Sequence, residues 1–135
     1  MFKLIKIQNS GVNVPELITL KKDEDTVFPA GVALVMKNGL INICDIDTKP
    51  THISFGCGKA GKSEAVCFEI YGNMFFETEL SDDIGDLKVG SNADLDTDPD
   101  GYVSFVSTAN PSGFVRVCDT CGAKHIGNKI VVKFN

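Results

Sequence analysis

The chain has 135 residues, 43% of them hydrophobic and 23% charged, a composition typical of one soluble globular domain with a core of its own. Its net charge of −5, without a Lys/Arg cluster, disfavours nucleic acid as a partner because phosphate binding requires positive charge. No apolar run approaches the ~20 residues that span a bilayer, so we expect no membrane partner. Five cysteines at irregular spacing and the lack of a signal-peptide hydrophobic stretch indicate synthesis in a reducing cytoplasm.

Short apolar stretches bounded by Gly, Pro, Asn and Asp recur along the whole chain. They are typical of strands and hairpins, and no window shows the 3.6-residue period of an amphipathic helix. The charged run Lys21 to Asp25 is expected to be solvated. The nine to eleven predicted strands lie in these stretches: Phe2 to Ile7, Glu16 to Leu20, Val32 to Lys37, Leu40 to Cys44, Pro50 to Phe55, Glu64 to Tyr71, Met74 to Leu80, the alternating residues Leu87 and Val89 before Gly90, the alternating residues Ala93 and Leu95 after it, Tyr102 to Ser107, Gly113 to Cys118 and Lys129 to Phe134.

The clearest local signal is Asn38-Gly39, which separates two apolar runs. Both central residues of a type I′ turn need positive φ, and Asn-Gly supplies them, so a β-hairpin is predicted there. We predict an all-β fold class, namely a single antiparallel β-barrel or β-sandwich of short strands over residues 1–135, without substantial helix. Residues 1–15 are predicted to form an N-terminal arm or an edge strand, suited either to pairing within the domain or to docking on a neighbour's sheet.

An acidic turn lies at the centre of the segment Leu87 to Ser107. Asp96, Asp98 and Asp100 occupy the first, third and fifth positions of an EF-hand-like loop, with Gly101 at the sixth, which makes the three aspartates candidate calcium ligands. The twelfth position, however, is Ser107 rather than a bidentate glutamate, and no flanking helices are predicted. The alternative is a solvated hairpin turn whose geometry is set by Pro and Gly.

The stretch Gly56 to Ser63, GCGKAGKS, matches the phosphate-binding P-loop pattern at every fixed position. A working P-loop also needs a helix after the loop and a parallel sheet around it. The chain predicts neither, because Glu64 to Tyr71 is rich in strand-forming residues. We therefore expect a loop between strands and keep nucleotide binding as a remote alternative.

Cys118, Cys121 and His125 are candidate zinc ligands. A structural zinc site needs four ligands, and no second Cys-x-x-Cys occurs in the chain. The alternative is a turn between the last two strands with small, half-buried thiols.

Nucleophilic or acid–base catalysis has little support in the sequence. His52 and His125 lie in extended or loop contexts without a nucleophile motif. Glu69, Glu77 and Glu79 lie on neighbouring predicted strands, so a carboxylate pair is geometrically feasible, but solvent-facing glutamates are the alternative. We expect no enzyme, no catalytic residues and no cofactor.

Taken together, the pieces of the chain resemble the capsid decoration (auxiliary head, or cement) proteins of tailed bacteriophages. The resemblance spans nearly the whole chain and is a pattern of strands and turns rather than a catalytic motif. The segments that carry it are Val14-Pro15, Gly31 to Val35, Asn38-Gly39, Pro50 to Ile53, Phe75 to Thr78, Leu87 to Ser91 with the following Asp-Gly hairpin, and Lys129 to Phe134. The loop Gly56 to Ser63 and the Cys-x-x-Cys pair are not part of that pattern.

The resemblance implies a non-enzymatic structural protein of a phage virion. Such proteins are small β-rich modules, often trimeric, that bind the outer capsid surface and stabilise the head against internal DNA pressure. The implied partners are the major capsid protein and further copies of this chain, and the implied location is the capsid surface after synthesis in the host cytoplasm. The alternative is a carbohydrate- or calcium-binding β-module of another virion component.

Overall fold

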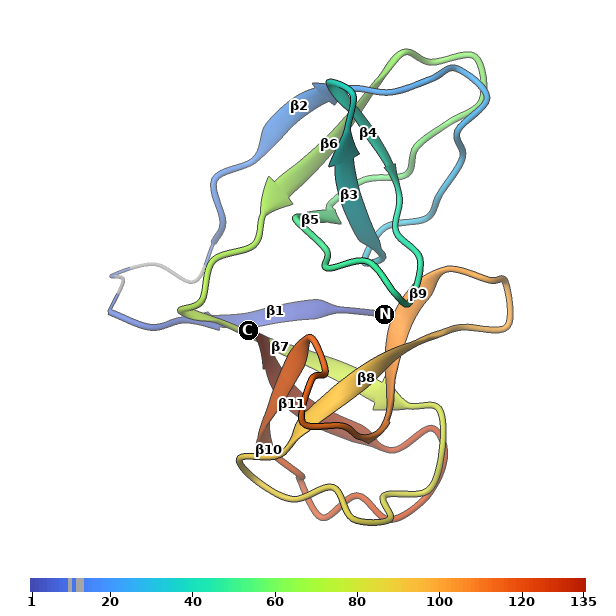
Figure 1. Cartoon of the computed structure of the whole chain (residues 1–135). Helices are drawn as coiled ribbons and strands as arrows, with labels where there is room; N and C mark the ends of the chain where they lie inside the picture. Colours follow the sequence, from blue (N-terminus) through green and yellow to red (C-terminus); the bar gives the residue numbers. More distant parts are fainter. Residues whose placement is uncertain (10, 12–13) are drawn as a thin grey trace.

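The computed structural model describes residues 1–9, 11 and 14–135, and these residues form eleven strands and no helix (Figure 1). None of them therefore belongs to a helix long and apolar enough to cross a membrane. The prediction of an all-β fold is confirmed. The strands are β1 (Lys3–Ile7), β2 (Ile18–Lys21), β3 (Ala33–Lys37), β4 (Leu40–Ile43), β5 (His52–Ser54), β6 (Glu64–Glu69), β7 (Met74–Leu80), β8 (Asn92–Thr97), β9 (Val103–Ala109), β10 (Val115–Asp119) and β11 (Lys129–Phe134).

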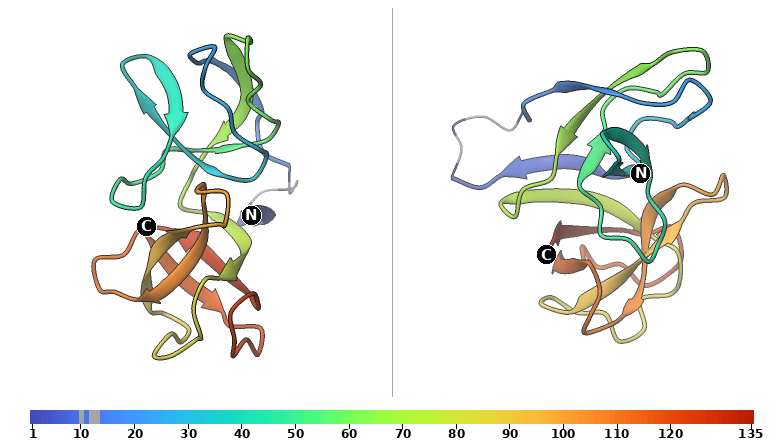
Figure 2. Two further views of the ribbon diagram at one scale, coloured as in Figure 1. Left: turned by 90° about the vertical axis from the view of Figure 1, so that its right-hand side faces the viewer. Right: turned by 45° about the horizontal axis from the view of Figure 1, so that its top comes forward.

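The C-terminal half of the chain forms a closed barrel of five strands. Its hydrogen-bonded order is β7-β11-β10-β8-β9, and a pairing between β7 and β9 completes the circle. In Figures 1 and 2 this barrel is the lower part of the molecule. The pairing of β7 with β9 is parallel and joins Glu79 to Phe105 and Leu80 to Val106, whereas the other pairings of the barrel are antiparallel. The β-barrel predicted from the sequence is therefore present, but one of its pairings is parallel rather than antiparallel.

Strand β7 shares one of its edges between two partners. β1 pairs antiparallel with its first half, from Met74 to Glu77, and β9 pairs with its last two residues. The opposite edge is occupied by β11. Figure 1 shows β1 lying between the barrel and the upper sheet, at the end of its own sheet.

The upper sheet has five antiparallel strands in the order β2-β6-β5-β3-β4. Its hairpin β3–β4 turns at Asn38 and Gly39, whose φ angles of 52° and 76° are the positive pair that a type I′ turn requires. The predicted Asn-Gly hairpin is confirmed.

The upper sheet buries side chains on both of its faces. Cys67 of β6 is in a small cluster around Phe28, while the next residue, Phe68, points into the larger core shared with the barrel. On β3, Ala33 and Leu34 divide in the same way. Because successive residues of a strand point to opposite faces, one sheet serves two hydrophobic clusters.

Four phenylalanines join the two sheets. The Phe76 ring on β7 contacts the rings of Phe2, Phe68 and Phe134, with centroids 6.2, 6.2 and 5.4 Å away. Phe2 and Phe134 are also in edge contact at 5.2 Å. Since Phe68 belongs to the upper sheet and Phe134 to the barrel, Phe76 is the side chain around which both layers pack.

Two details of the sequence prediction are wrong. Leu87 and Val89 were expected in a strand, but Lys88 to Ser91 form a turn closed by the hydrogen bond from Ser91 N to Lys88 O, 2.9 Å. Lys22 was expected to be solvated with its charged neighbours, but it is 3% exposed. The proposed N-terminal arm, residues 1–15, is described only in part, because residues 10, 12 and 13 lie outside the described residues.

We expect Phe76→Ala to lower the free energy of unfolding by about 3–5 kcal/mol, because the cavity would lie where both layers meet. Phe75→Ala is the matched control, since Phe75 is half-buried on the opposite face of β7 and should cost clearly less. Urea unfolding of both variants provides the measurement. Equal losses in the two variants would contradict the central position of Phe76.

Candidate functional site

The loop Gly56 to Ser63 connects β5 to β6 and is followed by a strand, not a helix. Several of its backbone N–H groups are used within the fold. Gly58 N donates to Phe28 O at 2.8 Å, Gly61 N to Glu24 O at 2.9 Å and Lys62 N to Lys59 O at 3.3 Å. These donors therefore do not converge on an open site, as the N–H groups of a phosphate-binding loop do.

The carbonyl groups of the same loop converge on a cation. The Lys22 ammonium donates to Lys62 O at 2.7 Å, to Lys59 O at 2.8 Å and to Asp23 O at 3.0 Å. All three donor positions of the ammonium are thus satisfied by the backbone. The loop presents negative dipole ends to a buried positive charge, which is the reverse of a P-loop.

Gly58 has a packing role in this loop. A Cβ atom at this position would lie 2.6 Å from Cε1 of Phe28, so a larger residue would displace that buried ring. The close approach allows the bridge between Phe28 and Gly58. Packing on Phe28, rather than access to a phosphate, explains this glycine.

The acidic turn is a well-bonded β-hairpin tip. Asp98 Oδ1 accepts hydrogen bonds from the backbone N–H groups of Asp100 and Tyr102, at 2.9 and 3.1 Å, and its Oδ2 accepts one from Ser104 Oγ at 2.9 Å. Such side-chain bonds to the local backbone define an Asx turn. The hairpin predicted at this place is confirmed, and Asp98 determines its shape.

The three candidate calcium ligands do not converge. Asp96 Oδ2 instead accepts a hydrogen bond from Ser81 Oγ at 2.7 Å, and Asp100 is exposed at the tip. Across residues 1–9, 11 and 14–135, no three His, Cys, Asp or Glu side chains are placed to hold a metal ion together.

The acidic tip does meet the glycine-rich loop, which the sequence alone did not indicate. Tyr102 Oη donates to Val27 O at 3.0 Å and so ties the hairpin to the upper half of the molecule. Asp100 and Tyr102 line an open hollow of about 480 Å³ together with Cys57 and Lys59. The hydrogen bond of Tyr102 links the hairpin β8–β9 to the upper half of the molecule at this side.

Among the described residues, the candidate zinc ligands Cys118, Cys121 and His125 likewise form no group that could hold a metal ion. Cys118 Sγ lies 3.6 Å from the carbonyl oxygen of Arg116, and Cys121 is exposed in a turn with φ of 52°. Burial is the main cause that raises the pKa of both thiols, and for Cys121 the Asp119 carboxylate adds to it. Both thiols are therefore held in the protonated form more strongly than a free cysteine.

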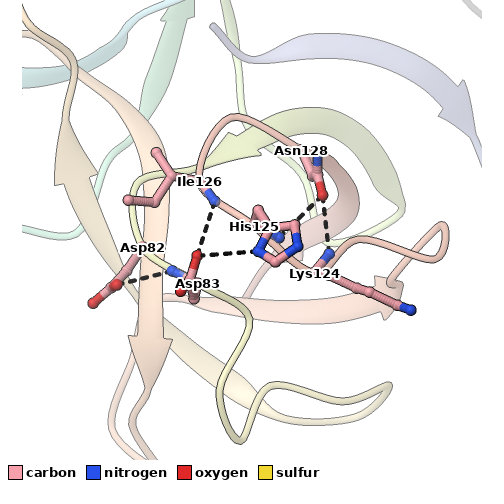
Figure 3. A network of polar contacts seen from close by, with 6 residues as sticks. All are labelled: Asp82, Asp83, Lys124, His125, Ile126 and Asn128. Carbon is pink, nitrogen blue, oxygen red and sulfur yellow. Dashed lines mark hydrogen bonds and ion pairs between the residues drawn. The ribbon is translucent and has the colours of Figure 1, made fainter.

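His125 belongs to a polar network that joins two loops at the lower end of the barrel (Figure 3). Its Nδ1 lies 3.6 Å from Asp83 Oδ1, which also accepts a hydrogen bond from Ile126 N at 3.3 Å. Asn128 Oδ1 accepts from the N–H groups of Lys124 and His125, each at 3.0 Å. The network connects the β10–β11 loop to the β7–β8 loop. His125 contributes to this connection through its contact with Asp83.

The other candidate catalytic groups are also bound within the fold. His52 is 7% exposed, its Nδ1 lies 2.7 Å from Thr51 Oγ1, and burial lowers its pKa, so the imidazole is neutral near pH 7. Glu77 pairs with Lys129 at 3.2 Å.

Of the three glutamates considered as a carboxylate pair, Glu77 and Glu79 share the outer face of β7, whereas Glu69 is on β6 in the other sheet. Glu69 accepts a hydrogen bond from Tyr71 Oη at 2.8 Å.

The remaining buried thiols are poor nucleophiles. Desolvation raises the pKa of Cys44 to about 12, with a smaller contribution from Asp45, and raises that of Cys67 to about 11. Both remain protonated near neutral pH, and the thiolate is the reactive form. Cys44 and Cys67 therefore act as core residues.

An apolar groove of about 430 Å³ lies beside β1. Its floor includes the buried rings of Phe2 and Phe68, and its rim includes Met1, Val14 and Phe55, which are 57%, 68% and 54% exposed. Large apolar side chains gathered at the surface are typical of binding sites. Sequence reasoning did not find this groove, because Phe55 and Phe68 come from segments distant from β1 in the chain.

Comparisons of the chain with protein-family models, curated proteins and solved structures return no match. The candidate site therefore rests on the geometry described above.

We expect Lys22→Met to lower the free energy of unfolding by about 2–3 kcal/mol, since three carbonyl groups would lose a charged donor. The neighbouring Lys21→Met is the control, because Lys21 is exposed and its replacement should change stability by about 0.5 kcal/mol or less. Thermal and urea unfolding of the two variants test this. A Lys22 variant as stable as the control would contradict the ammonium cage.

We also expect ATP with Mg²⁺ to leave the unfolding temperature unchanged. A nucleotide that bound the folded state at a hundred times its Kd would add about 2.7 kcal/mol of stability, which is easily measured. Differential scanning fluorimetry over a nucleotide titration is sufficient. If the nucleotide raised the unfolding temperature of the wild type but not that of the Lys62→Ala variant, in which an exposed lysine is removed, the phosphate-binding interpretation of the loop would be restored.

Proposed function

We propose that this protein is a non-enzymatic structural component of a phage virion that binds the outer capsid surface and stabilises the head. The observation that carries the proposal is the apolar groove along the edge strand β1, with Met1, Val14 and Phe55 exposed on its rim. An edge strand beside apolar pockets is suited to recognition of an extended chain. The partner in this proposal is the major capsid protein.

The rest of the chain supports a binding module rather than a catalyst. Several titratable groups take part in turns, loop closure or the core, as Asp98, His125 and Cys67 illustrate. A cement protein needs a rigid body and a surface that grips its neighbours, not an active site. Two sheets packed on one aromatic cluster provide such a body.

Self-association forms part of the proposal. The resemblance to decoration proteins favours a trimer on the virion, with synthesis in the host cytoplasm. The net charge of −5 keeps isolated copies soluble, so oligomers are expected to form on, or be stabilised by, the capsid lattice.

Co-sedimentation with capsids assembled from the major capsid protein encoded beside it provides the test. We expect saturable binding at a defined ratio to capsid subunits, and a higher temperature of DNA release from decorated heads. Tailless heads lacking the protein are the control. If the protein stayed in the supernatant with every capsid made by its genomic neighbours, the proposal would fail.

A further inference from the structure

The edge of β1 that faces away from β7 is the outer edge of the sheet. β1 stands last in the strand order, and the hydrogen bond from Phe2 N to Gly31 O, 2.8 Å, attaches its beginning to the upper half of the molecule. A register shift between Leu4 and Lys6 bends the strand. Bulges and lysines are the devices that keep edge strands from pairing indiscriminately.

The charge around the groove is opposite to that of the rest of the chain. All 18 acidic residues follow residue 15, whereas Lys3 and Lys6 lie on β1. Lys3 has the one charged side chain in the lining formed by the described residues, and it also lines a second hollow with Glu77, Glu79 and Lys129. Its cross-strand neighbour Glu77 is held by Lys129 at 3.2 Å, and no ion pair involving Lys3 is found in the described part of the chain.

We propose that the groove beside β1 binds an extended, acidic–apolar segment of the capsid partner. This inference rests on the proposed function. The segment lies along the outer edge of β1, places apolar side chains against Phe55 and Val14, and pairs a carboxylate with Lys3. Groove burial provides affinity, and Lys3 selects the charge of the segment.

The same charges disfavour a second copy of β1 as the occupant. Pairing two β1 strands edge to edge would bring Lys3 and Lys6 close to their counterparts, and like charges on neighbouring strands are destabilising. A partner segment carrying Asp or Glu meets no such repulsion. The rest of this acidic chain would repel that segment, so the N-terminal region is where it is accepted.

Four exposed-residue variants test the proposal in the capsid co-sedimentation assay. We expect Lys3→Glu and Phe55→Ser each to weaken capsid binding at least about tenfold, since one reverses the charge and the other removes an apolar contact. Lys37→Glu and Val89→Ser are matched controls, because both residues are exposed and neither lines the groove. Both controls should bind like the wild type, and all four should unfold at wild-type temperature.

Zero-length carbodiimide cross-linking of decorated capsids identifies the occupant, because it joins an amine to a carboxylate in direct contact. We expect Lys3 to be linked to an Asp or Glu of the major capsid protein. A link from Lys3 to another copy of this chain would overturn the assigned occupant. If all four variants bound capsids as strongly as the wild type, the groove would not be the binding site, but the capsid function would stand. If the wild type itself failed to bind capsids, both the groove proposal and the capsid function would fail.

Discussion

The structure depends on β7 having two different neighbours along one edge. β9 pairs with its last two residues and closes the barrel, while β1 pairs with its first half and leads to the upper sheet. Phe76 lies in the half that pairs with β1 and β11, so its ring enters the core shared by both layers. Barrel closure and layer packing are therefore coupled through a single strand. Neither sheet buries its apolar face without the other, as the membership of Phe68 in the barrel's cluster shows.

Local features of this fold could be predicted from the sequence, and its long-range pairings could not. The hairpin at Asn38-Gly39 and strand β11 follow from turn chemistry and two-residue alternation. The parallel pairing of β7 with β9 leaves no local signal in the sequence. Alternation of apolar and polar residues indicates which face of a strand is buried, but not which other strand pairs with it in the sheet. Leu87 and Val89 follow the two-residue alternation of a strand. Leu87, however, lies next to a turn, and its side chain enters the core from there.

The candidate sites show the same limit. Gly56 to Ser63 matches the letters of a P-loop, but the pattern does not encode which way the peptide dipoles point. In the structure the carbonyls of Lys59 and Lys62 face the Lys22 ammonium, so the loop is organised around a cation. One signal for Lys22 was present: it continues the alternation of Ile18 and Leu20 on one face of β2. Adjacent charges at positions 21 and 23–25 obscured it.

The basic N-terminal strand of this acidic chain is best explained by edge chemistry. An edge strand beside an apolar groove is exposed to unwanted pairing, and lysines with a bulge are the usual protection. Protection by charge differs from protection by a covering loop, because it excludes some partners and admits others. At Lys3, with Glu77 already paired to Lys129, the excluded partners are basic or self-similar strands and the admitted ones carry a carboxylate. The proposed capsid role would require this kind of selectivity, because the edge would have to remain unpaired in solution and pair on the lattice.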